Sequence, residues 1–426
     1  MKEPFKWDHY SDQPALLQDK KYKKLMRKKE LFSIAKTFFT ALLVLPLSLF
    51  FIPYVKRKKI NSKDFFCLGV DFQREPTLSL QAIDELKVQH ILTRIKLWEL
   101  DQLSDLKTFL KKTTNKKVTL KILQDRENIE DLELFEKNLR TIFTQLDGLV
   151  DIFEIGSTIN RSKWGFFSVS EYNSFYKVAY DLQQKEFPKF HLIGSGVIDF
   201  EFHFTAHTLF NFSKHRFDGV SSLLYVDRRG APENSQMGFN LSDKIAWLST
   251  LTWLSPKSKN EVHITETNWP LSGTAPYAPT SEYECIDEKS YADFMVRYYL
   301  LAFASQQINS VSWHQLIARG YGLIDNIDAM NYRPAYNTYK FMLENLLESQ
   351  FLRLDIKRDY YIFQCLVNDK LLQIHWSMHD THLKNEEHYT VFSRDGKKIE
   401  DRDIPIGSSP VYIYINKAVS EKVNCL

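Results

Sequence analysis

The sequence predicts an α/β protein, a (β/α)8 TIM barrel with an N-terminal transmembrane anchor and a small C-terminal all-β module. Three observations lead to this prediction. An uncharged stretch occupies residues 37–55, close to the N-terminus. Short apolar runs then alternate with amphipathic stretches over residues 64–348. From residue 350 to residue 426 the strand-like runs follow one another with no long helical pattern between them.

The N-terminal region separates from the rest of the chain by its charge. The net charge is only +3, but residues 1–63 carry 15 lysines and arginines against 5 acidic residues. The remainder is therefore net acidic, which argues against nucleic acid as a partner. The basic charge belongs to the N-terminal region, where residues 1–36 form a basic segment ahead of the anchor.

The stretch 37–55, TFFTALLVLPLSLFFIPYV, is long enough to cross about 30 Å of hydrocarbon as a helix. The many polar residues that precede it favour an uncleaved anchor over a cleaved signal peptide. A buried core helix is the alternative, and the cationic flanks on both sides count against it. These flanks are also suited to anionic lipid headgroups.

The orientation of the anchor is predicted from its flanking charges. Eight lysines and arginines between residues 20 and 36 precede the stretch, and five between residues 56 and 63 follow it. This balance favours a single pass with the barrel on the non-cytoplasmic, periplasmic side. A re-entrant hairpin around Pro46, with the barrel at the cytoplasmic face, is the alternative.

Eight candidate strands alternate with helical patterns, which is typical of a parallel sheet closed into a barrel. A doubly wound open sheet is the alternative, but no glycine-rich phosphate loop follows the first strand. Residues 350–426 are interpreted as a β-sandwich-like accessory module, with a hairpin signal at Asp395-Gly396. The eight candidate strands span residues 65–72, 90–98, 117–123, 148–156, 190–198, 219–226, 261–267 and 308–316.

Polar and aromatic side chains gather at the carboxyl ends of these strands, where barrels of this type place their sites. Indole rings stack on the apolar faces of pyranose rings, and polar groups hold sugar hydroxyls. The sequence therefore predicts a polysaccharide or oligosaccharide as ligand. The candidate residues are Arg94, Trp98, Asn160, Tyr225, Glu266, Asn268, Trp269, Trp313 and Gln315.

The motif HITETNWP at 263–270 resembles the end of the seventh strand in clan A glycoside hydrolases, which are retaining enzymes on a (β/α)8 barrel. The nearest group is the family 39-like and related exopolysaccharide glycosidases. YGLID at 321–325 and RPAYNTYKFM at 333–342 are similar to the usual run into the last helix. The resemblance implies that Glu266 is the nucleophile, with Tyr225 as its hydrogen-bond partner.

The same resemblance implies that Arg94 keeps this nucleophile ionised and that Trp313 belongs to the floor of the sugar site. The chain departs from the family in EIGSTIN at 154–160, where Thr158 stands at the position of the general acid/base glutamate. A threonine hydroxyl cannot protonate a leaving group near neutral pH.

A retaining mechanism needs two carboxyl groups about 5–5.5 Å apart, so another acid has to be found. Asp199 and Glu201, at the end of the fifth strand, are the candidate substitutes. Glu154 would lie roughly 13 Å deeper along its strand than Thr158 and is interpreted as a structural barrel residue.

No metal site and no cofactor is predicted. The four cysteines are widely separated and form no C-x-x-C pair. His203 and His207 have a ligand-like i, i+4 spacing but lie outside any H-E-x-x-H motif. The loop 227–230 is interpreted as a polar connection, with a grip on an anionic sugar as the alternative.

Two functions remain open. The first is a membrane-anchored glycosidase of the retaining type that acts on a cell-envelope or exported polysaccharide. The second is a catalytically inactive pseudo-glycosidase that binds or guides a polysaccharide at the membrane. With the barrel in the cytoplasm, the substrate would instead be a lipid-linked sugar or glycolipid precursor. The sequence identifies no protein partner, sugar, linkage or oligomeric state.

Overall fold

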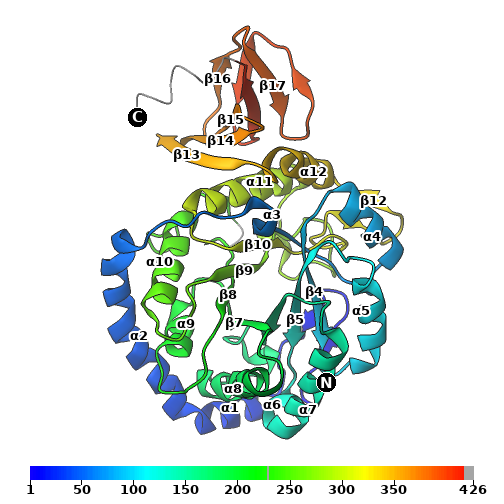
Figure 1. Ribbon diagram of the computed structural model, residues 1–426, viewed down its shortest axis with the longest axis vertical. Helices are drawn as coiled ribbons and strands as arrows, with labels where there is room; N and C mark the ends of the chain where they lie inside the picture. Colours follow the sequence, from blue (N-terminus) through cyan, green and yellow to red (C-terminus); the bar gives the residue numbers. More distant parts are fainter. Residues whose placement is uncertain (228–229, 417–426) are drawn as a thin grey trace.

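The computed structural model describes residues 1–227 and 230–416, and its centre is a closed barrel of eight parallel strands (Figure 1). The strand order is β10-β3-β4-β5-β6-β7-β8-β9, so each strand pairs with its sequence neighbours and the last closes on the first. All eight predicted strands are confirmed, several of them shorter than predicted. The strands are β3 (Phe66–Gly69), β4 (His90–Lys96), β5 (Lys117–Leu123), β6 (Ile152–Ile155), β7 (His191–Ile198), β8 (Gly219–Leu223), β9 (Val262–Thr267) and β10 (Ser310–Trp313).

Helices surround the barrel because their apolar residues recur at three- and four-residue steps and face the strands. In α7, for example, Phe135, Leu139 and Ile142 are buried. Ser168 caps α8 by accepting a hydrogen bond from the Glu171 amide, which explains where that helix begins. The helices are α3 (Ser62–Phe65), α4 (Pro76–Glu85), α5 (Leu103–Leu110), α6 (Arg126–Glu130), α7 (Leu132–Leu146), α8 (Val169–Glu186), α9 (Phe202–Leu209), α10 (Leu241–Leu254), α11 (Glu288–Ser305) and α12 (Pro334–Leu346).

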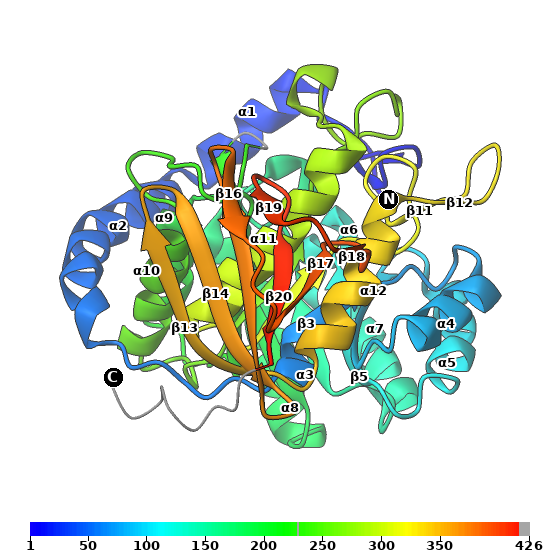
Figure 2. The ribbon, with the colours of Figure 1, turned by 90° about the horizontal axis from the view of Figure 1, so that it is seen from above.

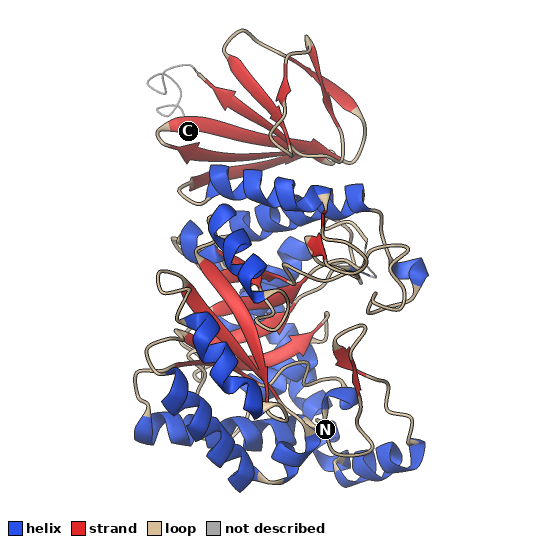
Figure 3. Ribbon diagram, turned by 90° about the vertical axis from the view of Figure 1, so that its right-hand side faces the viewer, coloured by secondary structure: helices blue, strands red, loops and turns tan. Residues whose placement is uncertain are grey.

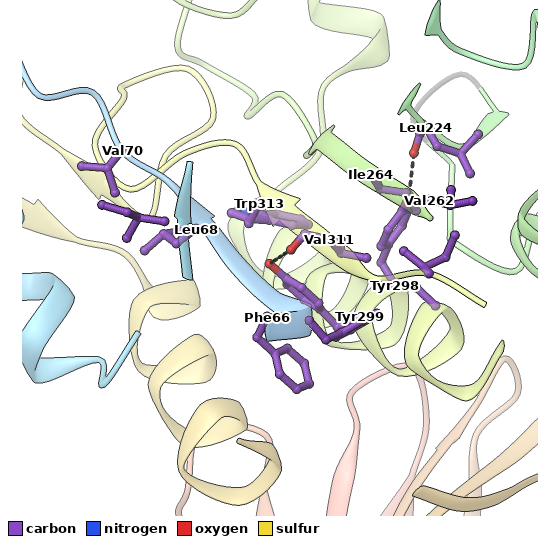
Figure 4. Packing of buried hydrophobic residues seen from close by; sticks show 14 of the residues in the cluster. Phe66, Leu68, Val70, Leu224, Val262, Ile264, Tyr298, Tyr299, Val311 and Trp313 are labelled. Atoms are coloured by element: carbon purple, nitrogen blue, oxygen red, sulfur yellow. Dashed lines mark hydrogen bonds between the residues drawn. The ribbon is translucent and has the colours of Figure 1, made fainter. Parts of the chain in front are cut away.

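Tyrosines of α11 tie the helical layer to the strands. The Tyr298 hydroxyl donates to the Leu224 carbonyl at 2.6 Å, and the Tyr299 hydroxyl donates to the Cys67 carbonyl at 2.9 Å. Their rings lie among the buried side chains of β3, β9 and β10 (Figure 4). Each ring thus buries apolar area while its hydroxyl satisfies a carbonyl at a strand end.

The N-terminal region begins at the barrel mouth and then runs down its flank. A two-stranded ribbon, β1 (Trp7–Asp8) with β2 (Gln13–Pro14), leads into α1 (Lys20–Lys29) and the long α2 (Leu31–Phe51). A short turn of 3-10 helix, Ile52–Tyr54, follows. Figures 1 and 2 show α2 outside α9 and α10, with the chain continuing to α3 and the start of β3. The segment 31–54 is continuous helix, so no hairpin turn interrupts it at Pro46.

The fully buried side chains of α2 are small, whereas Val44, Leu45 and Leu49 pack partly buried against the core. Ser33 bonds Ser170 of α8 at 2.6 Å, Thr37 bonds His207 of α9 at 2.7 Å, and the indole of Trp247 in α10 donates to Ser48 at 2.7 Å. The opposite face exposes its large apolar side chains, namely Leu31, Phe32, Phe38, Phe39, Leu42, Leu43, Leu47 and Phe50.

From residue 350 to residue 415 the described chain consists of strands that are joined by turns. The larger sheet is antiparallel and has the order β13-β14-β15-β20-β17-β18, and β16 pairs with β19. Figure 3 shows it beside α11 and α12, on the side away from the barrel strands. Its strands, and the small pair β11 (Ile324–Asp325) and β12 (Asn331–Tyr332), complete the fold: β13 (Gln350–Lys357), β14 (Tyr360–Val367), β15 (Lys370–Ser377), β16 (Thr381–Lys384), β17 (Tyr389–Ser393), β18 (Lys398–Ile399), β19 (Asp403–Ile406) and β20 (Val411–Ile415).

Candidate functional site

Glu266 lies at the carboxyl end of β9 and is held by two partners. The Tyr225 hydroxyl donates to its Oε1 at 2.8 Å, and the Lys121 ammonium lies 3.4 Å from its Oε2. Burial alone would raise the pKa of Glu266. The positive charge of Lys121, followed by smaller contributions from His314, Tyr225 and Arg94, outweighs burial and lowers the pKa to about 2. Glu266 is therefore an anion at neutral pH.

Lys121 also contacts a second carboxylate, Glu154, at 3.5 Å. Glu154 is fully buried, accepts a hydrogen bond from Thr265 at 2.8 Å, and has its pKa raised by burial. Its position inside the barrel agrees with the structural role expected from the sequence. The sequence does not predict this lysine as a site residue, because the run that contains it, 117–123, indicates only a strand.

Thr158 follows β6 and offers no acid. It is buried in a left-handed backbone conformation with φ of 53°, and its hydroxyl faces the Ser157 hydroxyl at 3.3 Å. Gln124 fixes this turn through hydrogen bonds with both the amide and the carbonyl of Ser157. The loop is thus held in place by hydrogen bonds, and it presents the hydroxyl of Thr158 where the sequence comparison with clan A enzymes leads us to expect a carboxyl group.

The candidate substitute acids Asp199 and Glu201 lie beside this loop. One guanidinium, that of Arg161, contacts Asp199 and Glu201 at 2.7 Å each. The Asn160 amide donates to Glu201 at 2.8 Å and to the Ile198 carbonyl at 2.9 Å. Both carboxylates and Tyr225 line one pocket of about 330 Å³. A general acid must carry a proton, whereas these two groups are engaged as ion-pair partners.

Arg94 makes its closest contact with Asp12, a residue of the N-terminal segment, and not with Glu266. It donates a hydrogen bond to the Asp12 carboxylate, which also lies 3.1 Å from Arg74. Burial would raise the pKa of Asp12, but Arg94, Arg74 and Lys96 lower it to about 2. The predicted influence of Arg94 on Glu266 is retained only as a longer-range contribution to its pKa.

The predicted tryptophans occupy two different positions. Trp98 lies at the mouth, with its ring 5.3 Å from that of Trp7. Trp269 and Trp313 are fully buried and stack on each other at 5.8 Å. In this conformation they pack beneath the mouth and cannot contact a sugar, which differs from the predicted substrate-binding role. Each ring is packed against tyrosines of α11, with Tyr298 beside Trp269 and Tyr291 beside Trp313.

Of the predicted polar site residues, Asn268 and Gln315 are also buried, and Asn268 donates to the His314 carbonyl. His314 itself is a site residue that the sequence did not reveal. Its ring stacks on Tyr321 at 5.3 Å, and burial lowers its pKa to about 4, so it is neutral at pH 7. Its place directly after Trp313 at a strand end was the only available signal.

The two histidines considered as metal ligands serve another purpose. His207 bonds Thr37 and His203 stacks on Phe38 at 5.6 Å, so both contact α2. A different group, in which ligand atoms lie within 4.8 Å of one another, stands near the start of β7 and β9 and consists of His191, Glu261 and His263. Of the loop 227–230, residues 228 and 229 lie outside the described part of the chain.

Solved structures with a similar fold are glycoside hydrolases. A family 39 glycoside hydrolase of the gut symbiont Bacteroides cellulosilyticus is 12% identical, with 84% of this chain and 82% of that chain covered and a TM-score of 0.64. A family 39 β-xylosidase of Caulobacter crescentus is 12% identical over 85% of this chain and 98% of that chain, with a TM-score of 0.58. A family 30 endoxylanase of Clostridium papyrosolvens is 7% identical over 85% and 97%, with a TM-score of 0.56.

The barrel has the fold of the family 39 and family 30 glycoside hydrolases. No family model and no curated protein sequence matches the chain. At these identities the likeness concerns the glycoside hydrolase-like fold alone. Support for the roles of Glu266 and Tyr225 therefore comes from the contacts within this chain.

Proposed function

We propose that this protein is a membrane-attached, glycoside hydrolase-like protein that acts on a cell-envelope or exported polysaccharide, with Glu266 in the nucleophile position. The observation that carries the proposal is the setting of Glu266. It is an ionised carboxylate at the carboxyl end of a barrel strand, and it accepts a hydrogen bond from Tyr225, which lines an open pocket. A carboxylate that attacks an anomeric carbon needs this ionised and fixed state.

A hydrolytic mechanism also needs a general acid, and Thr158 cannot supply one. Asp199, Glu201 and Glu284 line the pocket together with Tyr225, and of these Asp199 and Glu201 stand beside the loop of Thr158. For either to protonate a leaving group, substrate binding has to displace Arg161 from it. Without a replacement acid, the reaction loses roughly 10²–10⁴-fold in rate.

A second candidate function is binding without cleavage, and one observation favours it. The acid position holds a buried, rigidly bonded Thr158, and both neighbouring carboxylates are already paired with Arg161. A barrel of this kind would hold or guide a polysaccharide through the same mouth.

The two functions are separated by one set of assays on the full-length protein in detergent. Binding to a panel of envelope polysaccharides is measured by calorimetry, and new reducing ends are counted in the same samples. Glu266→Gln is the test variant. The matched control is Glu348→Gln, because Glu348 is an exposed glutamate that pairs with Lys63. Reducing ends that disappear only in Glu266→Gln support the hydrolase. Binding without new ends in all three proteins supports the binding function, and no binding to any polysaccharide refutes both.

We further propose that α2 attaches the protein to a membrane in the plane of the bilayer. One helical segment, Leu31–Tyr54, is long and apolar enough to cross a membrane. Hydrogen bonds of Ser33, Thr37 and Ser48 hold it along the barrel flank instead, and its apolar face is left exposed between two basic flanks. A single pass would require these hydrogen bonds to break.

Thiol accessibility distinguishes the two modes of attachment. Gln18→Cys and Asn61→Cys, placed at either end of the helical region, are probed in intact cells with a reagent that does not cross membranes. In-plane attachment gives both positions the same accessibility. A single pass, the mode expected from the flanking charges, gives them opposite accessibility.

A further inference from the structure

Residues 1–19, called here the N-terminal segment, lie across the mouth of the barrel. The segment contacts loops from both sides of the mouth: Gln13 accepts a hydrogen bond from Lys163 at 2.6 Å and donates one to the Pro279 carbonyl at 3.1 Å. Figure 2 shows the N-terminus at the same end of the barrel as β11 and β12. The chain thus covers its own candidate site.

Asp12 connects this segment to Arg94 of the barrel. Its side chain is 6% exposed and contacts two guanidinium groups, those of Arg94 and Arg74. Arg94 is only 10% exposed and belongs to β4, so it is fixed in the barrel whether or not the segment is present. Asp12 also adopts a left-handed conformation with φ of 52°, an arrangement that surrounding contacts must hold in place.

The two arginines make this a built carboxylate site. Arg74 has a second partner, Asp71, at 3.2 Å, whereas the ion pair recorded for Arg94 is with Asp12. A guanidinium this deeply buried needs an anion, because an unpaired charge at such a position is costly. Arginine is also the side chain best matched to the planar carboxylate. If Asp12 leaves, another carboxylate has to take its place.

The same segment covers an aromatic surface that is suited to a sugar ring. Trp7 lies 5.3 Å from Trp98 and 6.0 Å from Trp164, and the Lys96 ammonium stands 4.8 Å from the Trp7 ring. Trp98 lies two residues beyond the end of β4, the strand that carries Arg94. A carboxylate site and an apolar ring surface therefore lie side by side, and both are occupied by the chain itself.

We propose that Arg74 and Arg94 form the recognition site for the carboxylate of an acidic sugar, and that the N-terminal segment occupies this site as an internal competitor. Asp12 takes the place of the sugar carboxylate and Trp7 takes the place of the neighbouring pyranose ring. An acidic polysaccharide has to displace the segment to enter the mouth. This inference rests on the proposed carbohydrate function and narrows its substrate to polymers with carboxylate groups.

The first test compares binding of an acidic and a neutral oligosaccharide to the full-length protein in detergent. The probes are a galacturonic acid oligomer and a xylose oligomer of the same length. Asp12→Asn removes the competing charge, and Glu3→Gln removes an exposed charge from the same segment as the matched control. Because apparent affinity scales with the open fraction of the site, Asp12→Asn is expected to bind the acidic oligomer roughly ten-fold or more tightly than wild type. Glu3→Gln should bind it as wild type does.

Arg74→Gln supplies the complementary result. In combination with Asp12→Asn it should remove the preference for the acidic oligomer. The inference is overturned if Asp12→Asn binds the acidic oligomer no better than Glu3→Gln does, or if it binds it more weakly, since Asp12 would then be part of the binding surface. If Asp12→Asn binds the neutral oligomer alone, the inference fails while the proposed carbohydrate function stands. Tighter acidic binding without new reducing ends leaves the inference intact and counts against hydrolysis.

A second measurement follows the segment directly and does not depend on Asp12→Asn folding well. Ser11 is buried in the closed segment, so Ser11→Cys should react slowly with a thiol reagent. Replacing Cys285 and Cys425 by serine removes other thiols from the readout, because Cys67 and Cys365 are buried. The galacturonic acid oligomer should accelerate labelling at least several-fold, and the xylose oligomer should not. Unchanged labelling at an acidic oligomer concentration that saturates the protein would refute displacement.

Discussion

Glu154, which is fully buried, and Glu266, which is 17% exposed, lie beside the same lysine, yet their surroundings shift their pKa values in opposite directions. Lys121 and Tyr225 lower the pKa of Glu266, while burial raises the pKa of Glu154. Two carboxyl groups with diverging pKa values are a common feature of catalytic sites. Here the raised one is fully buried below the mouth, so its role is to hold Lys121 in place.

Replacing this lysine tests the electrostatic argument. The folded-state pKa of Glu266, about 2, lies below its value of about 4.3 in an unfolded chain. Its ionisation therefore stabilises the fold above about pH 4.3, and this contribution is lost as the pH falls towards 2. Lys121→Met should raise the folded-state pKa of Glu266 towards or above its unfolded value, so this loss of stability in acid should become smaller or change sign.

The measurement is the free energy of unfolding in urea between about pH 3 and pH 7. Lys121→Met should also lower this free energy at neutral pH by about 3–5 kcal/mol, because the buried Glu154 and the partly buried Glu266 both lose their ion-pair partner. Lys117→Met is the control, since Lys117 lies on the same strand but pairs with the half-exposed Asp64. An acid limb that stays unchanged in Lys121→Met would contradict the assignment.

At the residue scale the structure contains one contact that the sequence predicts, the hydrogen bond between Tyr225 and Glu266. The roles of these two residues in a site stay predictions. Asp12 could not be found, because its partner Arg94 is 82 residues away and nothing in the local sequence marks the pair. Lys121 could not be found either, because the pattern of residues 117–123 predicts a strand and does not indicate which charges lie opposite its side chains.

At the scale of elements, the eight strands were predictable because buried parallel strands are short, continuous apolar runs. The helix α2 was predictable as apolar, but its docking was not. Its small residues at positions 33, 37, 41 and 48 form a stripe that matches hydroxyl, imidazole and indole groups on three barrel helices. That match depends on the tertiary position of the partners.

Thr37 tests whether α2 is part of the folded domain. Thr37→Val keeps the shape of the side chain but removes the buried hydrogen bond to His207, leaving an imidazole nitrogen without this partner. We expect a loss of about 1–3 kcal/mol in the free energy of unfolding. Thr108→Val, at an exposed position in α5, should change it by less than about 0.5 kcal/mol. Equal effects of the two substitutions would show that α2 is not docked.

The exposed face of α2 can be tested separately from its docked face. Phe39→Ser with Leu42→Ser should reduce binding of the protein to vesicles containing anionic lipid, because two large apolar side chains that are 65% and 71% exposed are removed. Leu352→Ser with Ile356→Ser makes the same kind of change on the C-terminal sheet and should leave vesicle binding unchanged. Sedimentation with vesicles measures both, and equal losses would place the membrane contact elsewhere.

At the scale of the whole molecule, the C-terminal sheet is joined to the barrel by a buried ionic cluster. Glu233, in the loop after β8, accepts hydrogen bonds from Arg297 of α11 and from the indole of Trp376 of β15, both at 2.8 Å. Arg297 also donates to the Ser408 carbonyl at 3.0 Å. One loop of the candidate site is thereby fixed by residues from the far side of the chain.

Breaking this cluster should loosen the two parts together. Arg297→Met leaves the Glu233 carboxylate buried without its ion-pair partner and should lower the free energy of unfolding by about 3–5 kcal/mol. Arg140→Met, which breaks an ion pair with the partly exposed Glu186, should cost less than about 1 kcal/mol. Urea unfolding of both variants provides the comparison, and a small effect of Arg297→Met would show that the sheet and barrel are independent.

The path of α2 sets how a long polymer would meet the mouth. The helix begins next to the segment that covers the mouth and leads to the start of β3 at the opposite end of the barrel (Figure 2). A bilayer against its exposed face would therefore touch the side of the barrel and not either end. The mouth would then open sideways, so that a glycan chain sliding along the lipid surface would meet it without first having to bend away.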